Sequence, residues 1–172
     1  MTKSIVIIIG GGFGGLNAAK ALKKANVDIL LIDKMNYHLF QPLLYEVATA
    51  ALSPGEIATP LREILRNQEN VSVIMGEVAD INTTQKQVIL SNQAWFGYDY
   101  LIIATGARHS YFGNDQWEAF APGLKTIPDA LNIREQILIS FEKAERADFG
   151  SLFNICNHWR RAYWSRNGRR YC

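Results

Sequence analysis

Three glycines near the start of the chain have types and spacing that suit the binding of a pyrophosphate. Gly10, Gly12 and Gly15 follow the G-x-G-x-x-G pattern, directly after the apolar run Ile5–Ile9 and before an alanine-rich stretch. In this pattern the first glycine permits a sharp turn, the second lets the backbone approach phosphate, and the third allows a helix to pack closely on its strand. Backbone N–H groups and the helix dipole then hold the anion without a charged side chain.

Asp33 is the second residue that points to a dinucleotide. It ends another apolar run, Val27–Ile32, close to the offset of about 20 residues at which an acid binds the ribose hydroxyls. A carboxylate at this position also argues against a cofactor that carries a 2′-phosphate. Glycines also serve ordinary turns, so a purely structural turn is the alternative to dinucleotide binding.

These residues require a strand, a tight turn, a helix and a second strand. We predict that the helix runs through about Ala25. The stretch Lys34–Thr49 is rich in aromatic residues and lacks a clean period, so we predict that it forms a loop lining a pocket. Ser53 to Glu56 form a capping-box pattern that predicts a helix to about Arg66, with a bend at Pro60.

The following segments predict a parallel sheet with a small antiparallel addition. Further strands are expected at 71–75 and 77–81, antiparallel strands at 87–90 and 96–100, and a buried strand in 100–106 that ends in a glycine turn. A helix from Pro128 to Glu145 is expected to pack on the sheet. Its predicted apolar stripe consists of Leu131, Ile137, Leu138, Phe141 and Ala144. The fold class is therefore α/β, a Rossmann-type parallel sheet flanked by helices.

Composition is that of a globular protein of one ordinary domain. The chain has 172 residues, and no run approaches the roughly 18 apolar residues of a membrane span, so we expect a cytoplasmic product without a transmembrane segment or signal peptide. All 16 acidic side chains precede residue 151, whereas residues 151–172 carry five arginines and both cysteines. The basic net charge therefore belongs to this tail, and no nucleic-acid partner and no metal site are predicted.

Four stretches carry a resemblance to a known family. From the first strand to about Gly150, the chain resembles the N-terminal part of type II NADH dehydrogenases, flavoproteins that pass electrons from NADH to a membrane quinone. The stretches are Gly10–Gly15, His38–Thr49, Tyr98–Gly106 and Phe120–Lys125. The first and third occur in all flavoproteins with two dinucleotide domains, whereas the second is more particular to this family.

The resemblance implies that the dinucleotide is FAD, with NADH and a quinone as substrates of the intact family, which lies peripherally on the cytoplasmic face of the membrane. The resemblance implies that the FAD pyrophosphate contacts Gly10, Gly12, Phe13, Gly14 and Gly15, and that the adenosine ribose contacts Asp33 and Lys34. It also implies that the adenine contacts the main chain of Val78 and that Thr105 lies near the flavin side. Related disulfide reductases carry a redox cysteine pair where this chain has 38–49 without cysteine, so the acceptor is not a protein disulfide.

His38 in that stretch is predicted to be structural, and the sequence assigns no catalytic residue. Two alternatives remain open at this stage. One is a nucleotide-binding module without catalysis, and the other is an FAD-dependent reductase with another acceptor, such as a ferredoxin.

The resemblance also implies a second glycine turn, for NADH, shortly after Gly150, where the sequence instead has the arginine-rich residues 151–172. Tryptophan has a single codon, TGG, so reading one nucleotide later converts Trp159 and Trp164 to glycine, at the first and last positions of a G-x-G-x-x-G turn. We therefore predict two domains. Residues 1–150 form an incomplete FAD-binding domain that holds FAD weakly, and residues 151–172 are an out-of-frame translation caused by a one-nucleotide insertion or a sequencing error just before Asn154. The alternative is a genuine tail that is disordered or binds lipid or nucleic acid.

Overall fold

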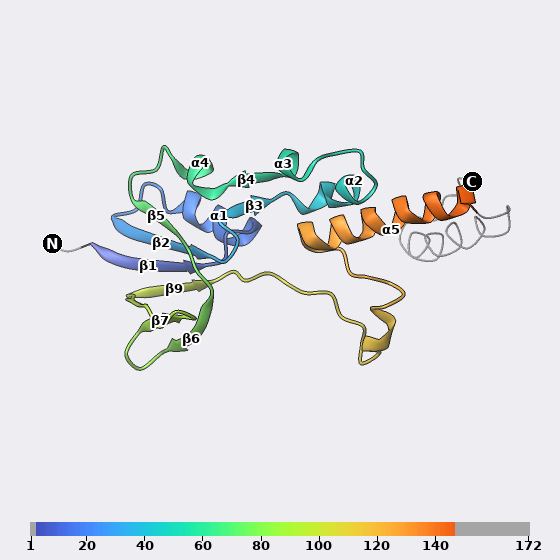
Figure 1. Ribbon diagram of the computed structural model, residues 1–172. Coiled ribbons are helices and arrows are strands. Elements are labelled where there is room, and N and C mark those ends of the chain that lie inside the picture. The colour runs from blue at the N-terminus through green and yellow to red at the C-terminus, as the bar shows by residue number, and fades with distance from the viewer. Residues whose placement is uncertain (1–2, 147–172) are drawn as a thin grey trace. The chain divides into compact units, whose positions relative to one another are not determined.

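The computed structural model describes residues 3–146. The predictions for residues 151–172, which concern the shifted reading frame and the cysteines, lie outside the described residues. The domain boundary at residue 150 also stays a prediction. Figure 1 shows the elements in chain order. They are β1 (Ser4–Ile9), α1 (Phe13–Ala21), β2 (Val27–Asp33), β3 (Tyr37–Leu39), η1 (Gln41–Leu43), α2 (Leu44–Ala48), α3 (Pro54–Ile57), β4 (Ala58–Pro60), α4 (Leu61–Leu65), β5 (Val71–Met75), β6 (Val78–Asn82), β7 (Gln87–Leu90), β8 (Trp95–Gly97), β9 (Tyr100–Ile103), η2 (Asp115–Trp117) and α5 (Ile127–Arg146).

The chain forms two compact units, and the first contains a parallel sheet. This first unit consists of Met1–Phe40 and Gly55–Ala107, and the second contains Gln41–Pro54 and the described residues from Arg108 onward. In the first unit the strand order is β5-β2-β1-β9, and every neighbouring pair is parallel. Because the strands are parallel, their carboxyl ends meet at one edge of the sheet, where Rossmann-type folds bind ligands.

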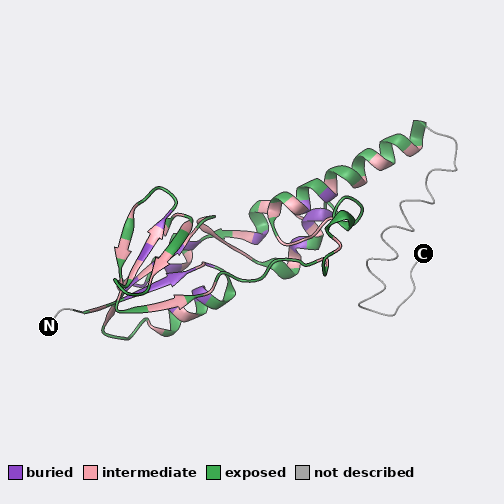
Figure 2. Ribbon diagram, turned by 90° about the horizontal axis from the view of Figure 1, so that it is seen from below, coloured by how far each residue is buried: buried purple, intermediate pink, exposed green. Residues whose placement is uncertain are grey.

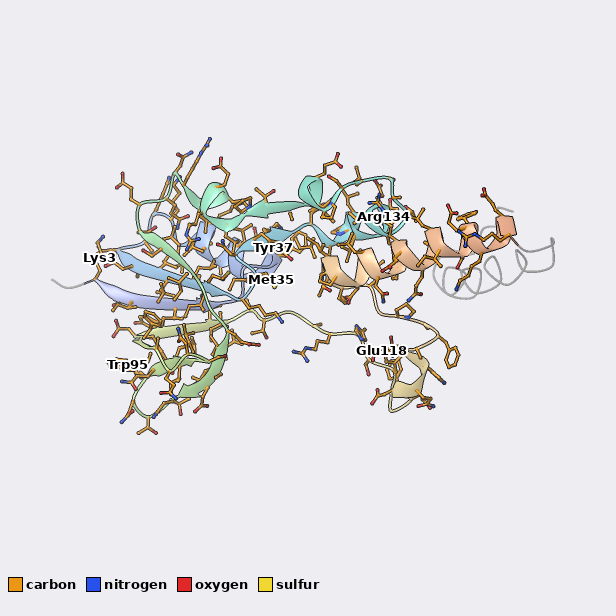
Figure 3. The ribbon with its side chains drawn as sticks, in the orientation of Figure 1. Lys3, Met35, Tyr37, Trp95, Glu118 and Arg134 are labelled. Carbon is orange, nitrogen blue, oxygen red and sulfur yellow. The ribbon has the colours of Figure 1, made fainter. Side chains whose placement is uncertain are left out.

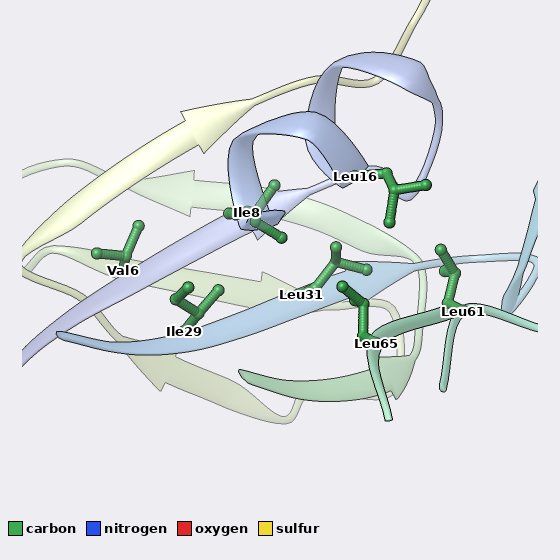
Figure 4. Close-up of a cluster of buried hydrophobic side chains, with 8 residues drawn as sticks. Val6, Ile8, Leu16, Ile29, Leu31, Leu61 and Leu65 are labelled. Carbon is green, nitrogen blue, oxygen red and sulfur yellow. The ribbon is translucent and has the colours of Figure 1, made fainter. Parts of the chain in front are cut away.

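β1 is apolar and buried from Val6 to Ile9, because both faces of this part of the strand are covered. Val6 and Ile8 point to one face, with Leu16 and Ala19 of α1 and Leu61 and Leu65 of α4 (Figure 4). Ile7 and Ile9 point to the other face, where they pack with Val88 and Leu90 of β7. The antiparallel sheet β6-β7-β8 therefore covers the face of the parallel sheet that the helices leave open. The predicted α/β class with a small antiparallel addition is confirmed.

α1 ends earlier than the predicted Ala25. Its last helical residue is Ala21, and two polar side chains then bind the backbone carbonyls at this end. The buried Gln68 donates to the Ala19 carbonyl at 2.8 Å, and Asn70 donates to the Leu22 carbonyl at 3.1 Å. The two amides satisfy carbonyls that a longer helix would have satisfied itself.

Two further local predictions are wrong in their details. The stretch 34–49 is not a loop, because it contains β3, η1 and α2, and the predicted helix up to Arg66 is divided into α3 and α4 by β4. β3 and β4 pair antiparallel, with His38 opposite Thr59 and Tyr37 opposite Pro60. Pro60 has φ −55° and ψ 131°, so it lies in an extended conformation and breaks the helix rather than bending it.

The strand predicted within residues 100–106 is β9, and it lies at the edge of the parallel sheet rather than fully buried within it. The predicted antiparallel strand 96–100 is divided, since β8 ends at Gly97 and β9 begins at Tyr100. Within the described sheet, β9 has β1 as its neighbour and lies at the edge, and Tyr100 and Ile103 are 63% and 62% exposed. Figure 2 shows buried residues on strands and on helices, and β9 contains only intermediate and exposed residues.

In the second unit, α5 packs against α2, and its buried residues are Ala130 and Ile133. The helix matches the predicted 128–145, but the predicted packing stripe is wrong, because Leu131, Leu138 and Phe141 are exposed. A capping box starts α5: Asp129 accepts the N–H of Thr126 at 2.8 Å, and Thr126 Oγ1 accepts the N–H of Asp129 at 3.3 Å. Burial raises the pKa of Asp129, but the hydrogen bonds from the Lys125 and Thr126 N–H groups outweigh it, and the pKa is lowered from 3.8.

Candidate nucleotide-binding site

Gly10 makes the turn at the carboxyl end of β1, and only glycine fits there. Its φ is +103°, a conformation that side-chain-bearing residues rarely adopt. A Cβ on Gly10 would also overlap the carbonyl oxygen of Ala104, which follows β9. The Gly10 N–H donates to the Ile32 carbonyl at 2.8 Å, and the Ala104 N–H donates to the Ile9 carbonyl at 2.8 Å. These bonds tie the turn to both neighbouring strands.

The absence of a side chain at Gly15 lets the first turn of α1 pack directly against this glycine turn. A Cβ at this position would overlap the carbonyl oxygen of Gly10 and would lie 3.1 Å from Cγ2 of Ile8. Gly15 is buried, in agreement with the role that the glycine spacing predicts for it.

Gly12 and Gly14 are exposed, and both have room for a Cβ. A Cβ on Gly12 would meet no atom within 4 Å, and one on Gly14 would lie 3.6 Å from Cβ of Ala104. Gly12 is the N-cap of α1, without a side-chain cap hydrogen bond, and the first turn of this helix contains no acid. Backbone N–H groups at a helix start favour an anion. The residues present therefore fit a diphosphate that approaches the Gly12–Gly14 backbone.

Asp33, at the carboxyl end of β2, holds the glycine turn itself. Its Oδ2 accepts the Gly11 N–H at 2.6 Å, and its Oδ1 accepts the Met35 N–H at 2.7 Å. Burial, followed by the negative charge of Asp33, raises the pKa of Tyr37. Met35 and Tyr37 are labelled in Figure 3. A carboxylate has about four acceptor positions, so these two bonds leave capacity for a ribose hydroxyl, and that contact stays a prediction.

The other predicted site residues do not all lie beside the glycine turn. Thr105 is exposed, and its Cα lies 3.3 Å from the position of a Cβ on Gly10, so the structure brings it to the turn. Lys34 follows Asp33 and is exposed. Val78 begins β6 in register with Leu90 and packs into the cluster around Ile7 and Ile9, on the face opposite α1. Its predicted adenine contact and that of Lys34 with the ribose stay predictions.

Phe13, the remaining predicted contact, is 44% exposed at the start of α1. Its ring lies 4.8 Å from that of His38 and 5.8 Å from that of Phe40, edge to face in both pairs. The aromatic residues of β3 and its end therefore pack against the helix start that follows the glycine turn.

Gly11 is a site residue that the glycine pattern does not identify. It is buried between the exposed Gly12 and the turn at Gly10, and a Cβ on it would overlap the side chain of Leu61. Its carbonyl oxygen lies 3.1 Å from Nδ1 of His38. Leu61 and His38 are 50 and 27 residues away in the sequence, and no spacing rule links them to the turn.

Two observations concern residues 3–146 as a whole. None of their helices has the length and hydropathy of a membrane span. No group of three or more His, Cys, Asp or Glu side chains within this range is arranged to hold a metal ion.

Comparison with known proteins places this geometry in a family. The model of the pyridine nucleotide-disulphide oxidoreductase family matches residues 4–140. Two relatives from Mycobacterium tuberculosis are similar: type II NADH:quinone oxidoreductase Ndh, 55% identical over 83% of this chain and 31% of its own length, and type II NADH:quinone oxidoreductase NdhA, 57% identical over 81% and 30%.

Among solved structures, NDH2 from Plasmodium falciparum in complex with NADH superimposes with a TM-score of 0.73, at 31% identity, over 84% of this chain and 30% of that chain. The chain thus spans about a third of the length of the curated relatives it matches. With its parallel sheet, glycine turn and matching sequence, the chain belongs to the pyridine nucleotide-disulphide oxidoreductase family and has that family's Rossmann-like FAD-binding fold.

Proposed function

We propose that this chain is the FAD-binding part of a type II NADH:quinone oxidoreductase. The identity of 55–57% to two mycobacterial enzymes with this name supports the assignment, since it extends over more than four fifths of the chain. When bound, FAD would accept a hydride from NADH and pass electrons to a quinone. In this proposal, the residues of the glycine turn and its neighbours bind FAD and orient it.

One observation carries the proposal for FAD: the Gly12–Gly14 backbone is open to an approaching diphosphate while the residues on both sides of it are fixed. Gly10 is tied to β2, Gly15 is packed under the turn, and Gly11 is buried. A rigid backbone with N–H groups facing solvent binds an anion without first losing conformational freedom. Phe13 then adds an apolar surface beside the first turn of α1.

The remaining predicted contacts divide the ligand along the edge of the sheet. Asp33 and Lys34 would hold the adenosine ribose, the main chain of Val78 the adenine, and Thr105 would lie near the flavin. Thr105 and Asp33 are close to opposite sides of the glycine turn, one beside Gly10 and the other bonded to Gly11. This placement suits a ligand that extends in both directions from its pyrophosphate.

NADH, quinone and the membrane surface are assigned to the whole enzyme. The 172 residues contain a single G-x-G-x-x-G turn, so we propose that NADH binds to a part of the enzyme outside them. We also propose a cytoplasmic location, with the intact enzyme on the cytoplasmic face of the membrane. The chain alone would then bind FAD weakly and would not reduce quinone, because part of the ligand stays in water.

Titration of the purified chain tests both parts of this proposal. FAD is added while flavin fluorescence is measured, and NADH is then added while absorbance at the flavin band is followed. We expect weak FAD binding, and no bleaching by NADH. Absence of FAD binding at any concentration overturns the FAD assignment. Bleaching by NADH shows that residues 1–172 suffice for hydride transfer and overturns the assignment of NADH to another part.

A further inference from the structure

His38 lies where it can orient the peptide that precedes Gly12. Its Nδ1 is 3.1 Å from the carbonyl oxygen of Gly11. A carbonyl oxygen accepts hydrogen bonds and does not donate them, so this contact assigns the Nδ1 hydrogen to the imidazole. Gly11 is buried, and the contact is part-buried. The side chain of His38 thus supplies a partner for a carbonyl that sits inside the turn.

The ring of His38 is itself held in position. β3 pairs with β4, and His38 lies opposite Thr59 in this ladder. The ring also contacts Phe13 edge to face, with an interplanar angle of 83°. A side chain on a paired strand with an aromatic neighbour loses little further freedom when it holds the Gly11 carbonyl, so the hydrogen bond costs little entropy.

Gly11 is fixed at three points that come from three parts of the sequence. Its N–H donates to Asp33, its carbonyl contacts His38, and Leu61, which is fully buried, fills the space beside its Cα. With the neighbouring residues held in this way, the 11–12 peptide has a defined plane. In a trans peptide the C=O and the next N–H point in opposite directions. Holding the Gly11 carbonyl toward His38 therefore directs the Gly12 N–H away from His38.

We propose that His38 is a positioning residue of the phosphate-binding turn, which aims the Gly12 N–H at the ligand by binding the Gly11 carbonyl. This inference rests on the proposed function insofar as the ligand is the pyrophosphate of FAD. The hydrogen bond also polarises the peptide, and such cooperativity strengthens the Gly12 N–H as a donor by about 10–30%.

Three variants separate this role from simple packing. His38→Phe keeps an aromatic ring against Phe13 and removes the hydrogen bond. His38→Asn places an amide N–H where Nδ1 lies, whereas His38→Gln places it about one bond further away. His109→Phe is the matched control, since it changes a histidine of the second unit to the same residue.

Two readouts are taken on the full 172-residue chain. One is FAD affinity by fluorescence titration, and the other, without ligand, is hydrogen exchange of the Gly11 N–H, whose bond to Asp33 opens more often when the Gly11 carbonyl is no longer held. Loss of one hydrogen bond predicts about fivefold weaker FAD binding and about fivefold faster exchange in His38→Phe. His38→Asn should return both values to within about twofold of the parent chain, and His109→Phe should change neither.

Each outcome decides the proposal. Unchanged exchange and affinity in His38→Phe overturn it, and so does an equal loss in His38→Phe and His38→Asn, which indicates packing alone. If the His38→Phe variant does not fold, the comparison of His38→Asn with His38→Gln decides, because only the asparagine side chain keeps the hydrogen bond to the Gly11 carbonyl. Absence of FAD binding by the parent chain overturns the proposed function, while the exchange of Gly11 still decides the role of His38.

Discussion

At the residue scale, the glycines of the turn differ in what surrounds them. Neighbouring backbone excludes a side chain at Gly10 and Gly15, whereas Gly12 and Gly14 have room for a Cβ. The same residue type thus serves folding at two positions, and at the other two we propose that it serves ligand access. Substitution by alanine separates these roles, because a methyl group is the smallest change that fills the space.

Gly15→Ala is expected to destabilise the chain by about 1–3 kcal/mol, as overpacking does, because its Cβ overlaps the Gly10 carbonyl oxygen. Gly12→Ala is the matched control, and it should cost less, at most about 1 kcal/mol, because its Cβ meets no atom and alanine is only a poorer N-cap than glycine. Urea unfolding followed by far-UV circular dichroism measures both. Equal stability of the two variants would contradict the packing assigned to Gly15.

Gly12→Ala is expected to weaken FAD binding about tenfold despite its small effect on stability. The φ of Gly12 is −71°, which alanine adopts, so the new methyl group changes access rather than the backbone. It occupies the open space through which a diphosphate approaches, at a cost of about 1.4 kcal/mol for a tenfold loss. The measurement is a fluorescence titration, and parental affinity in this variant would place the phosphates elsewhere.

At the element scale, α4 supports the turn through Leu61. This side chain is fully buried, and it fills the space that a Cβ on Gly11 would need. Leu61→Ala should cost about 2–5 kcal/mol, as large-to-small core changes do. Gly11→Ala alone should also be destabilising, because its Cβ meets Cδ1 and Cδ2 of Leu61.

The double variant Gly11→Ala, Leu61→Ala should lose less stability than the sum of the two single variants. The methyl added at Gly11 enters the space that the leucine side chain vacates, so the coupling should be at least about 0.5 kcal/mol. Urea unfolding of the four chains gives this coupling directly. Simple additivity would show that Gly11 and Leu61 do not share this space.

The capping box of α5 should give stability that depends on pH. The pKa of Asp129 is lowered from 3.8, so its carboxylate stabilises the folded chain above about pH 4, and this contribution is lost as the pH falls through the lowered pKa. Asp129→Asn keeps an acceptor oxygen but removes the charge, so it should cost about 0.3–1 kcal/mol at pH 7 and less below pH 4. Unfolding curves at both pH values test this, with Glu135→Gln as an exposed control on the same helix.

The sequence sufficed for elements whose signals are local. The apolar runs at β1, β2 and β5, the glycine turn and the start of α5 all follow from patterns of neighbouring residues. The pairing of β3 with β4 and the end of α1 at Ala21 depend on residues far apart, such as Asn70 at the end of that helix. The support of Gly11 by His38 and Leu61 is likewise a long-range contact.

At the scale of the whole molecule, the gene sequence tests the prediction for residues 151–172. Removing one nucleotide just before the codon for Asn154 should give a β-rich run, a Gly-Gly-Gly-Pro-Thr-Gly turn, a helix and an open frame beyond the present stop. Sequencing the gene across the codons for Ser151 to Asn154 is the measurement. A verified sequence with neither the turn nor the open continuation would show that the tail is genuine.

The position of β1 between β2 and β9 has a consequence for synthesis on the ribosome. β2 emerges soon after β1, but Ile8 and Ile9 pair with Ile102 and Ile103, more than 90 residues later. At about 5–20 residues per second, this delay lasts roughly 5–20 s. During this time one edge of the most apolar strand has no partner from its own chain. The interval is a window for chaperone binding, and slow codons between the two strands would lengthen it.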